Sequence, residues 1–229
     1  MNHSSLRRIA AGVSSLAVCA GALALAAAPA AHAGSVSGFG AGPVGVPQTI
    51  TVNGFPGCGQ VTATATGVSS TSTSAYTDIN GNATIYWTPT SVGNATVGIS
   101  STCTPDPVGT YSISQVSTST SISAPNTAKV GQATKVTVIV SSSSPSTYSP
   151  TGTVTVRDGS GNQVGNPMGL TAGPGQGQSY AYWWWTPPAT GSYVFQATYN
   201  ADSNATGSTS PQDLVNASAS GGTITLSAP

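Results

Sequence analysis

The chain has 229 residues, which is enough for one or two domains. Only 4% of its residues are charged, with five cationic and five acidic side chains, against roughly 25% in ordinary soluble domains. This composition argues against a nucleic-acid-binding protein, because such proteins gather several Lys and Arg side chains on one face.

Residues 1–33 have the pattern of an export signal. Arg7 and Arg8 precede an apolar run over residues 9–28, and an Ala-His-Ala cleavage motif ends at Ala33. A lipoprotein signal acylated at Cys19 is the competing interpretation, but the residues after Cys19 stay apolar. We expect cleavage after Ala33, no membrane span in the remaining chain, and a secreted, extracellular or cell-surface location.

Removal of this segment would leave a chain without His or Glu, with three cations and five Asp side chains. General acid–base catalysis at neutral pH usually needs His, a tuned carboxylate pair or Lys. The remaining Asp residues are scattered, so we expect no enzyme, no cofactor and no metal centre. A calcium site is the alternative for four oxygen-bearing residues, which are also ordinary turn formers: Asp158, Asn162, Asp202 and Asn204.

The first half of the chain predicts strands separated by short turns. Residues 34–46 are rich in Gly, Ala and Ser, and we expect a flexible lead-in there. Asn80-Gly81 is a strong hairpin signal, because both residues tolerate positive φ. The strands are expected at residues 48–52, 60–65, 83–87, 95–103 and 111–116.

Cys58 and Cys103 are the two cysteines that remain after cleavage. In an oxidising compartment two cysteines are most simply a disulfide, here predicted to join the two sheets of a sandwich. A redox pair or a metal site is the alternative, but the chain has no C-x-x-C motif and would have no His to complete a metal shell.

The second half repeats a feature of the first at an interval of 98 residues. An aromatic strand ends in Trp-Thr-Pro at Trp87 and again at Trp185, and each is followed by a Gly and a new alternating strand. A repeat of this length in a strand-rich chain favours tandem β-sandwiches. Further strands are expected at residues 118–122, 135–140, 152–156 and through the Trp-rich segment before Trp185.

The second half also resembles a known family. The segments Pro150-Thr151-Gly152-Thr153-Val154 and Gly191-Ser192-Tyr193-Val194-Phe195 are similar to two strands of bacterial Ig-like repeat domains. A weaker similarity, to invasin-type Ig-like repeats, covers residues 78–83 and 87–89. The resemblance implies an all-β chain of two tandem immunoglobulin-like β-sandwich domains, at residues 34–116 and 117–229, used in surface display or adhesion without catalytic residues.

The aromatic strand carries the candidate binding residues. If Trp185 faces the core as Trp87 does, alternation turns Tyr180, Tyr182 and Trp184 outward. Three rings at alternate positions make a strip about 13 Å long, which can stack on sugar rings or form a protein interface. The alternative is that the strip lies under a loop or against the first domain.

These observations predict a secreted or cell-surface, non-catalytic protein with an adhesion, binding or structural role. The expected partner is a cell-envelope or host protein or glycan. The alternative is a carbohydrate-binding module that uses the aromatic strip.

Overall fold

The computed structural model describes residues 34–101, 108–143 and 145–221. Every regular element in these ranges is a β-strand, which confirms the all-β class. None of the described residues belongs to a helix that could span a membrane. The predicted export signal at residues 1–33 and Cys103 both lie outside the described residues.

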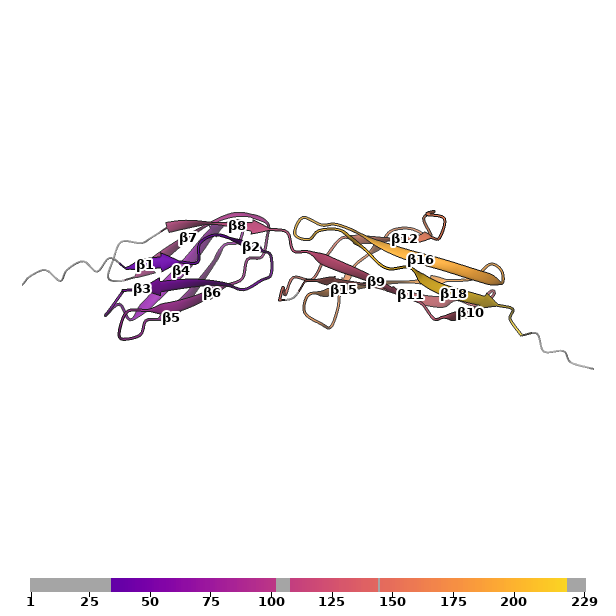
Figure 1. Cartoon of the computed structure of the whole chain (residues 1–229), viewed down its shortest axis with the longest axis horizontal. Coiled ribbons are helices and arrows are strands. Elements are labelled where there is room, and N and C mark those ends of the chain that lie inside the picture. Colours follow the sequence, from indigo (N-terminus) through magenta and orange to yellow (C-terminus); the bar gives the residue numbers. More distant parts are fainter. Residues whose placement is uncertain (1–33, 102–107, 144, 222–229) are drawn as a thin grey trace, which may run out of the picture. The chain divides into compact units, whose positions relative to one another are not determined.

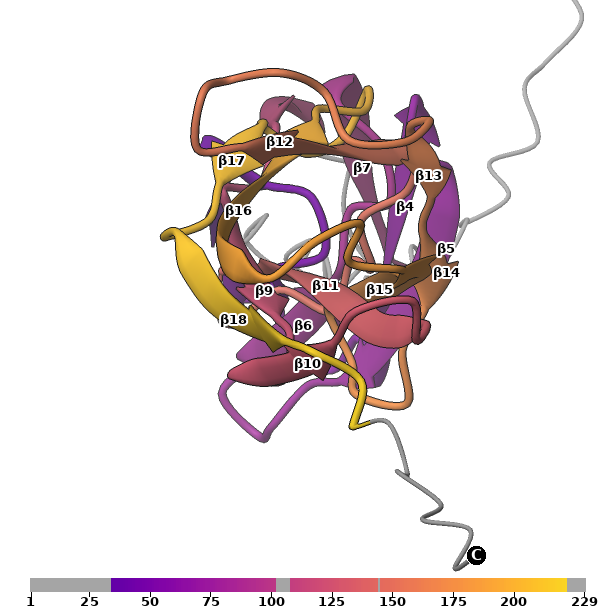
Figure 2. The same ribbon diagram turned by 90° about the vertical axis from the view of Figure 1, so that its right-hand side faces the viewer.

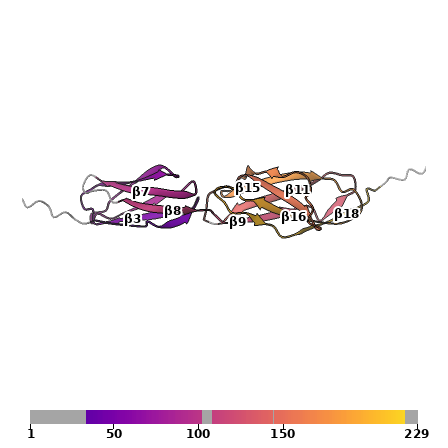
Figure 3. The ribbon, with the colours of Figure 1, turned by 90° about the horizontal axis from the view of Figure 1, so that it is seen from above.

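The first eight strands form two sheets that face each other (Figure 1). The three-stranded sheet has the order β1-β3-β6, with β1 (Ser35–Ser37), β3 (Gln48–Asn53) and β6 (Ala83–Trp87). The five-stranded sheet has the order β2-β8-β7-β4-β5, with β2 (Ala41–Pro43), β8 (Val108–Ser114), β7 (Gly93–Ser101), β4 (Gln60–Gly67) and β5 (Thr71–Tyr76). Strands β7 and β8 pair antiparallel and lie side by side (Figure 3).

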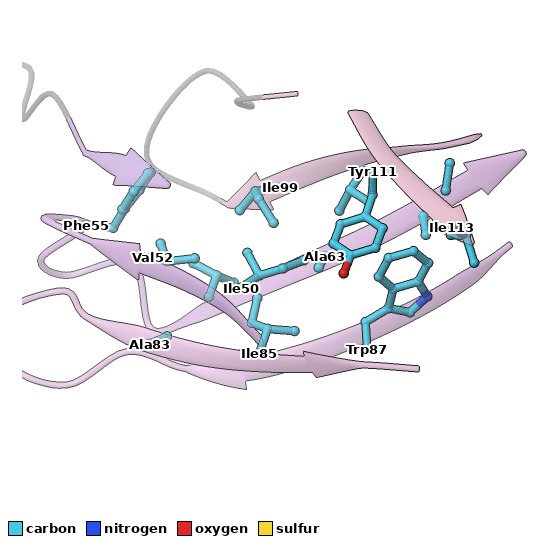
Figure 4. Packing of buried hydrophobic residues seen from close by; sticks show 14 of the residues in the cluster. Ile50, Val52, Phe55, Ala63, Ala83, Ile85, Trp87, Ile99, Tyr111 and Ile113 are labelled. Carbon is cyan, nitrogen blue, oxygen red and sulfur yellow. The ribbon is translucent and has the colours of Figure 1, made fainter. Parts of the chain in front are cut away.

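Alternation along these strands builds the core of the first sandwich. On β6, Ala83, Ile85 and Trp87 are buried while the residues between them are exposed, because successive side chains of a strand point to opposite faces. The Trp87 ring meets the Tyr111 ring edge-on, with centroids 5.1 Å apart. Figure 4 shows this pair at one end of the cluster and Phe55 at the other.

Two features of the first sandwich differ from the sequence-based expectation. The predicted flexible lead-in instead contributes β1 and β2, and Val44 directly after β2 is fully buried. Strand β5 was not predicted at all, because its Thr- and Ser-rich sequence lacks the apolar alternation that marks a strand. Both segments are held by pairing with distant strands, β2 with β8 and β5 with β4.

The remaining strands form a second pair of sheets. One sheet has the order β14-β15-β11-β9, with β14 (Thr171–Ala172), β15 (Gln178–Trp185), β11 (Thr134–Ser142) and β9 (Thr118–Ser123). The other sheet has the order β10-β18-β16-β12-β13, and a further short strand, β17 (Ser208–Thr209), also pairs with β16. The strands of this sheet are β10 (Thr127–Lys129), β18 (Asp213–Ser218), β16 (Gly191–Asn200), β12 (Thr153–Asp158) and β13 (Met168–Gly169). The predicted division of the chain at residues 116/117 falls between β8 and β9.

The second core lies between these two sheets. Figure 2 shows β11 and β15 across from β12, and buried valines of β11 and β12 fill the space together with Phe195 and Tyr199 of β16. Trp185 and Trp183 both contact the Phe195 ring edge-on, with centroid distances of 4.9 and 5.4 Å. The inner side of the Trp-rich strand is therefore fixed by ring packing as well as by strand pairing.

The Trp repeat occupies corresponding places in the two sandwiches. Trp87 ends β6 opposite Gln48, the first residue of β3, and Trp185 ends β15 opposite Thr134, the first residue of β11. Both indoles are buried. The glycines after them, Gly93 and Gly191, begin the next strand at positive φ of 135° and 147°. The sequence repeat thus corresponds to the same strand end and following turn in each sandwich.

Candidate functional site

The outer face of strand β15 carries an exposed row of aromatic rings. Tyr182 and Trp184 are 51% and 60% exposed, and Tyr180, two residues earlier on the same face, is partly exposed. Between them, Ala181 is buried and Trp183 is partly buried, and the flanking residues Ser179 and Trp185 are buried. We call Tyr180, Tyr182 and Trp184 the aromatic strip.

Strands β11 and β9 supply the surroundings of the strip. Register places Ile139, Thr137 and Lys135 of β11 directly opposite the three rings in turn. Beyond them, Ser121 and Ser123 of β9 lie opposite Ile139 and Thr137. The face therefore offers aromatic rings, hydroxyl groups and a single ammonium group.

Lys135 is in direct contact with the strip. Its Nζ lies 4.6 Å from the centroid of the Tyr182 ring, within the range of a cation–π interaction worth about 0.5–1 kcal/mol at an exposed site. This contact restrains the Tyr182 ring. A restrained ring loses less side-chain entropy when a partner stacks on it.

A second organised feature is the loop after β16, which is built around the Asp202 carboxylate. One oxygen, Oδ2, accepts hydrogen bonds from the Tyr148 hydroxyl at 2.8 Å, from the Thr151 backbone N–H at 2.8 Å and from the Thr151 hydroxyl at 2.7 Å. The other, Oδ1, accepts from the backbone N–H groups of Asn204 and Ala205 at 2.8 and 2.7 Å.

This arrangement strongly favours the ionised form of Asp202. Partial burial raises its pKa, but hydrogen bonds from Thr151, Tyr148 and Asn204 outweigh burial and lower the pKa to about 2. The neighbouring Tyr199 hydroxyl responds in the opposite direction, because burial and the Asp202 carboxylate both raise its pKa. The ionised Asp202 carboxylate therefore holds the loop together through these hydrogen bonds.

Comparison with protein families identifies the second sandwich. Residues 119–218 match the family model of the bacterial Ig-like domain (group 3). These residues form an Ig-like domain. The match runs from β9 to the end of β18, and it confirms the resemblance of the second half. Among curated proteins, no sequence matches the chain.

Several solved structures are similar to the chain at low scores. The BSP domain of a biofilm-associated protein is 21% identical over 80% of this chain and 29% of its own, with a TM-score of 0.28. The D0–D1 domain of intimin is 20% identical over 80% of this chain and 97% of its own, with a TM-score of 0.30. The CARDB domain of a Pyrococcus furiosus protein, solved with di-metal ions, is 20% identical over 44% and 91%, with a TM-score of 0.32. The chain spans less than a third of the biofilm-associated chain.

The two family-like segments form neighbouring strands of the Ig-like domain. The first gives β12 and the second begins β16, and these strands pair antiparallel from Thr153–Asn200 to Asp158–Phe195. The weaker invasin-type similarity falls on the β5–β6 turn and the end of β6, and it stays a prediction.

The four residues considered for calcium divide between two turns of the Ig-like domain. Asp158 lies at one end of the β12–β16 pair, where its carboxylate accepts bonds from Ser160 and Asn162, and hydrogen bonds led by the Asn162 backbone N–H lower its pKa. Asp202 follows the other end. Within the described ranges, no three His, Cys, Asp or Glu side chains are grouped as a metal site. Both carboxylates serve as turn acceptors.

Cys58 lies buried in the first core, in the turn before β4. Its predicted partner is outside the described residues, so the Cys58–Cys103 disulfide stays a prediction. Strand β7, described as far as Ser101, is the direct neighbour of β4, with Ser101 opposite Val61. Because Cys103 lies outside the described residues, the expectation that the bond joins the two sheets also stays a prediction.

A set of polar contacts that the sequence does not predict links the Ig-like domain to the first sandwich. The Asn204 side chain accepts from the Val92 backbone N–H at 3.0 Å. The buried Ser146 hydroxyl donates to the Val44 carbonyl at 3.0 Å, and the Thr147 backbone N–H donates to the Gly45 carbonyl at 2.9 Å. No sequence signal identifies the carbonyls of Val44 and Gly45 that Ser146 and Thr147 contact.

Glycine is required at position 45, which lies against Ser146 and Tyr148 in this set of contacts. Its φ is +74°, and an added Cβ would lie 2.5 Å from the Ser146 Oγ and 2.6 Å from the Tyr148 nitrogen. Tyr148 packs against both hydrophobic clusters while its hydroxyl donates to Asp202. The Asp202 loop, through Tyr148 and Asn204, thus takes part in the contacts between the sandwiches.

Proposed function

We propose that this chain is an exported, non-catalytic protein of the cell surface or extracellular space, and that it acts in adhesion through its Ig-like domain. The observation that carries this proposal is the aromatic strip, a row of large rings left in water on a charge-poor sheet. Exposed Tyr and Trp side chains are typical of surfaces that acquire a partner, where they serve as binding anchors. The partner is a cell-envelope or host protein or glycan.

The match of residues 119–218 to a bacterial Ig-like domain supports a surface role for the chain. A test of export is expression of the full chain in a secreting bacterium, followed by mass spectrometry of the protein in the medium or envelope. The proposal expects a mature protein that begins at Gly34. Retention of the whole chain in the cytoplasm would contradict it.

The binding role is tested with labelled full-length protein on cell-wall fragments and on immobilised host-matrix proteins. Trp184→Ala should reduce retention at least about tenfold, because loss of an anchor ring costs about 1.4 kcal/mol or more. Leu214→Ala is the matched control, since Leu214 is 49% exposed on β18 of the opposite sheet. Equal retention of the two variants would contradict binding through the strip.

Carbohydrate binding is the second candidate function, and one observation favours it. The rings follow one another at every second residue, with Thr137 and Ser121 hydroxyls on the neighbouring strands, so stacking and hydrogen bonding are available on one flat face. A glycan array with wild-type protein and Trp184→Ala distinguishes this candidate. Specific glycan binding that the substitution abolishes supports it, whereas retention on proteins alone supports a protein partner.

A further inference from the structure

The first sandwich has a polar groove on the side where its two sheets meet at strands β5 and β6. The groove has a volume of about 520 Å³, within the range of small-molecule sites. Its walls come from three places in the chain: Thr51 and Asn53 of β3, Tyr76 at the end of β5 with Asp78 in the turn that follows, and Asn82 and Thr84 at the start of β6. We call it the Tyr76 groove.

The turn that closes the groove is rigid. The Asp78 carboxylate accepts hydrogen bonds from the backbone N–H groups of Asn80 and Asn82 at 2.9 and 2.8 Å and from the Asn82 side-chain amide at 3.2 Å. Gly81, at a φ of +77°, lies so close to the Phe55–Pro56 backbone that a Cβ would be 2.1 Å from the Phe55 carbonyl carbon. This end of the groove is therefore preorganised, which lowers the entropic cost of binding there.

Three polar side chains of the groove are open to a ligand. Among the described residues, none makes a hydrogen bond to the side chain of Thr51, Asn53 or Thr84, although hydroxyl and amide groups normally have partners. The Tyr76 ring is 78% exposed at the rim. Hydrogen bonds, led by that from the Asn82 backbone N–H, lower the pKa of Asp78, so the groove carries a permanent negative charge at neutral pH.

These groups select the class of ligand. The described residues that line the groove include no Lys or Arg, which disfavours phosphates, nucleic acids and acidic sugars beside a carboxylate. The lining also lacks large aliphatic side chains, so it offers no apolar pocket for a protein anchor. A ring that can stack, surrounded by hydroxyl, amide and carboxylate groups, matches the faces and hydroxyls of an uncharged sugar.

A second ring extends this surface beyond the groove. Tyr86 is 67% exposed and points to the same side of β6 as Thr84, about 7 Å further along the strand. We propose that the Tyr76 groove binds an uncharged saccharide chain, with Tyr76 as a stacking platform, Asn53 and Asp78 as hydrogen-bonding partners, and Tyr86 as a second platform. This site is separate from the aromatic strip and does not depend on its function.

Affinity electrophoresis of the full chain tests the proposal, with soluble uncharged polysaccharides (glucans, mannans and xylans) and acidic ones (hyaluronan and polygalacturonate) in the gel. At least one uncharged polymer should retard the wild-type protein. Tyr76→Ala should weaken that retardation about tenfold or more, and Tyr76→Phe should retain most of it. Ile79→Ala is the matched control, because Ile79 is an exposed residue of the same turn that does not line the groove.

The Trp184→Ala variant, run in the same electrophoresis experiment, distinguishes binding in the Tyr76 groove from binding on the aromatic strip. If the groove is the site, Trp184→Ala is retarded as strongly as wild type, and loss in Trp184→Ala alone overturns the proposal. It is also overturned if no uncharged polymer retards the wild type, if Tyr76→Ala behaves as wild type, or if acidic polymers retard the protein as strongly. A thermal melt verifies that each variant is folded, and Asn53→Ala, expected to weaken binding as well, replaces Tyr76→Ala if that variant is not folded.

Discussion

Replacement of Asp202 by Asn should destabilise the second sandwich in a pH-dependent way. The carboxylate accepts five hydrogen bonds. The substitution removes the charge and places an amide NH₂ group on one side of the site. If that group takes the place of Oδ2, it meets the Thr151 backbone N–H, which is also a donor and cannot accept a hydrogen bond. The variant protein thus loses the stabilisation by the Asp202 charge and at least one hydrogen bond at this site.

The magnitude follows from the pKa of the carboxyl group. A folded-state pKa of about 2 in place of 3.8 corresponds to about 2.4 kcal/mol in favour of the folded state when the group is ionised. Because Asp202 is partly exposed to solvent, screening reduces this to about 1–2 kcal/mol. The pKa is lower in the folded protein, so this stabilisation is complete above pH 5 and is lost as the pH falls from 3.8 through about 2.

The assay is urea unfolding followed by tryptophan fluorescence, since three of the four tryptophans lie on β15. At pH 7 the Asp202→Asn variant should be less stable than wild type by about 1–2 kcal/mol, and at pH 2 most of the difference should disappear. Asp213→Asn is the control, because Asp213 accepts one hydrogen bond, from the Ala124 backbone N–H at 2.7 Å. Equal stability at pH 7, or a difference that persists unchanged at pH 2, would refute the assignment.

Further predictions concern the first sandwich and its contacts. If Cys58 and Cys103 are bonded, non-reducing peptide mapping detects the linked peptides, and Cys103→Ser lowers the free energy of unfolding by roughly 4 kcal/mol, the chain-entropy value for a loop of about 45 residues; free thiols at both positions would exclude the bond. Gly45→Ala should cost about 1–3 kcal/mol more than Gly57→Ala, because both glycines have positive φ but only Gly45 has neighbours within 4 Å of the added Cβ. Equal melting temperatures for these two variants would show that the contacts of Gly45 contribute nothing.

The Trp-rich strand could be predicted from sequence because one of its faces is buried. Burial on one side enforces a period of two, and the placing of Trp185 inward then determines the direction of every neighbouring side chain. The same logic located β3, β4 and β6 to within two residues at each end. The Asn80-Gly81 signal likewise marked a true turn, in which Gly81 has positive φ.

The parts that sequence did not predict depend on distant partners. Strand β5 has almost no apolar residues and exists because β4 pairs with it, so no local pattern identifies it. The Tyr76 groove could not be predicted from sequence for the same reason, since it forms only when β3, β5 and β6 are neighbours in the fold. The Asp202 cluster joins Tyr148 and Thr151 to a loop about 50 residues later, and no spacing rule connects such positions.

Acrylamide quenching of tryptophan fluorescence tests most directly whether the aromatic strip is a binding surface. In the free protein Trp184 should account for most of the accessible fluorescence, because Trp87 and Trp185 are buried and Trp183 packs against the core. Titration with cell-wall or host glycan extract should protect this component and shift its emission to the blue, and Trp184→Phe should abolish both changes. Accessible fluorescence that stays unprotected at every extract concentration, or protection that persists in Trp184→Phe, would contradict the proposed function.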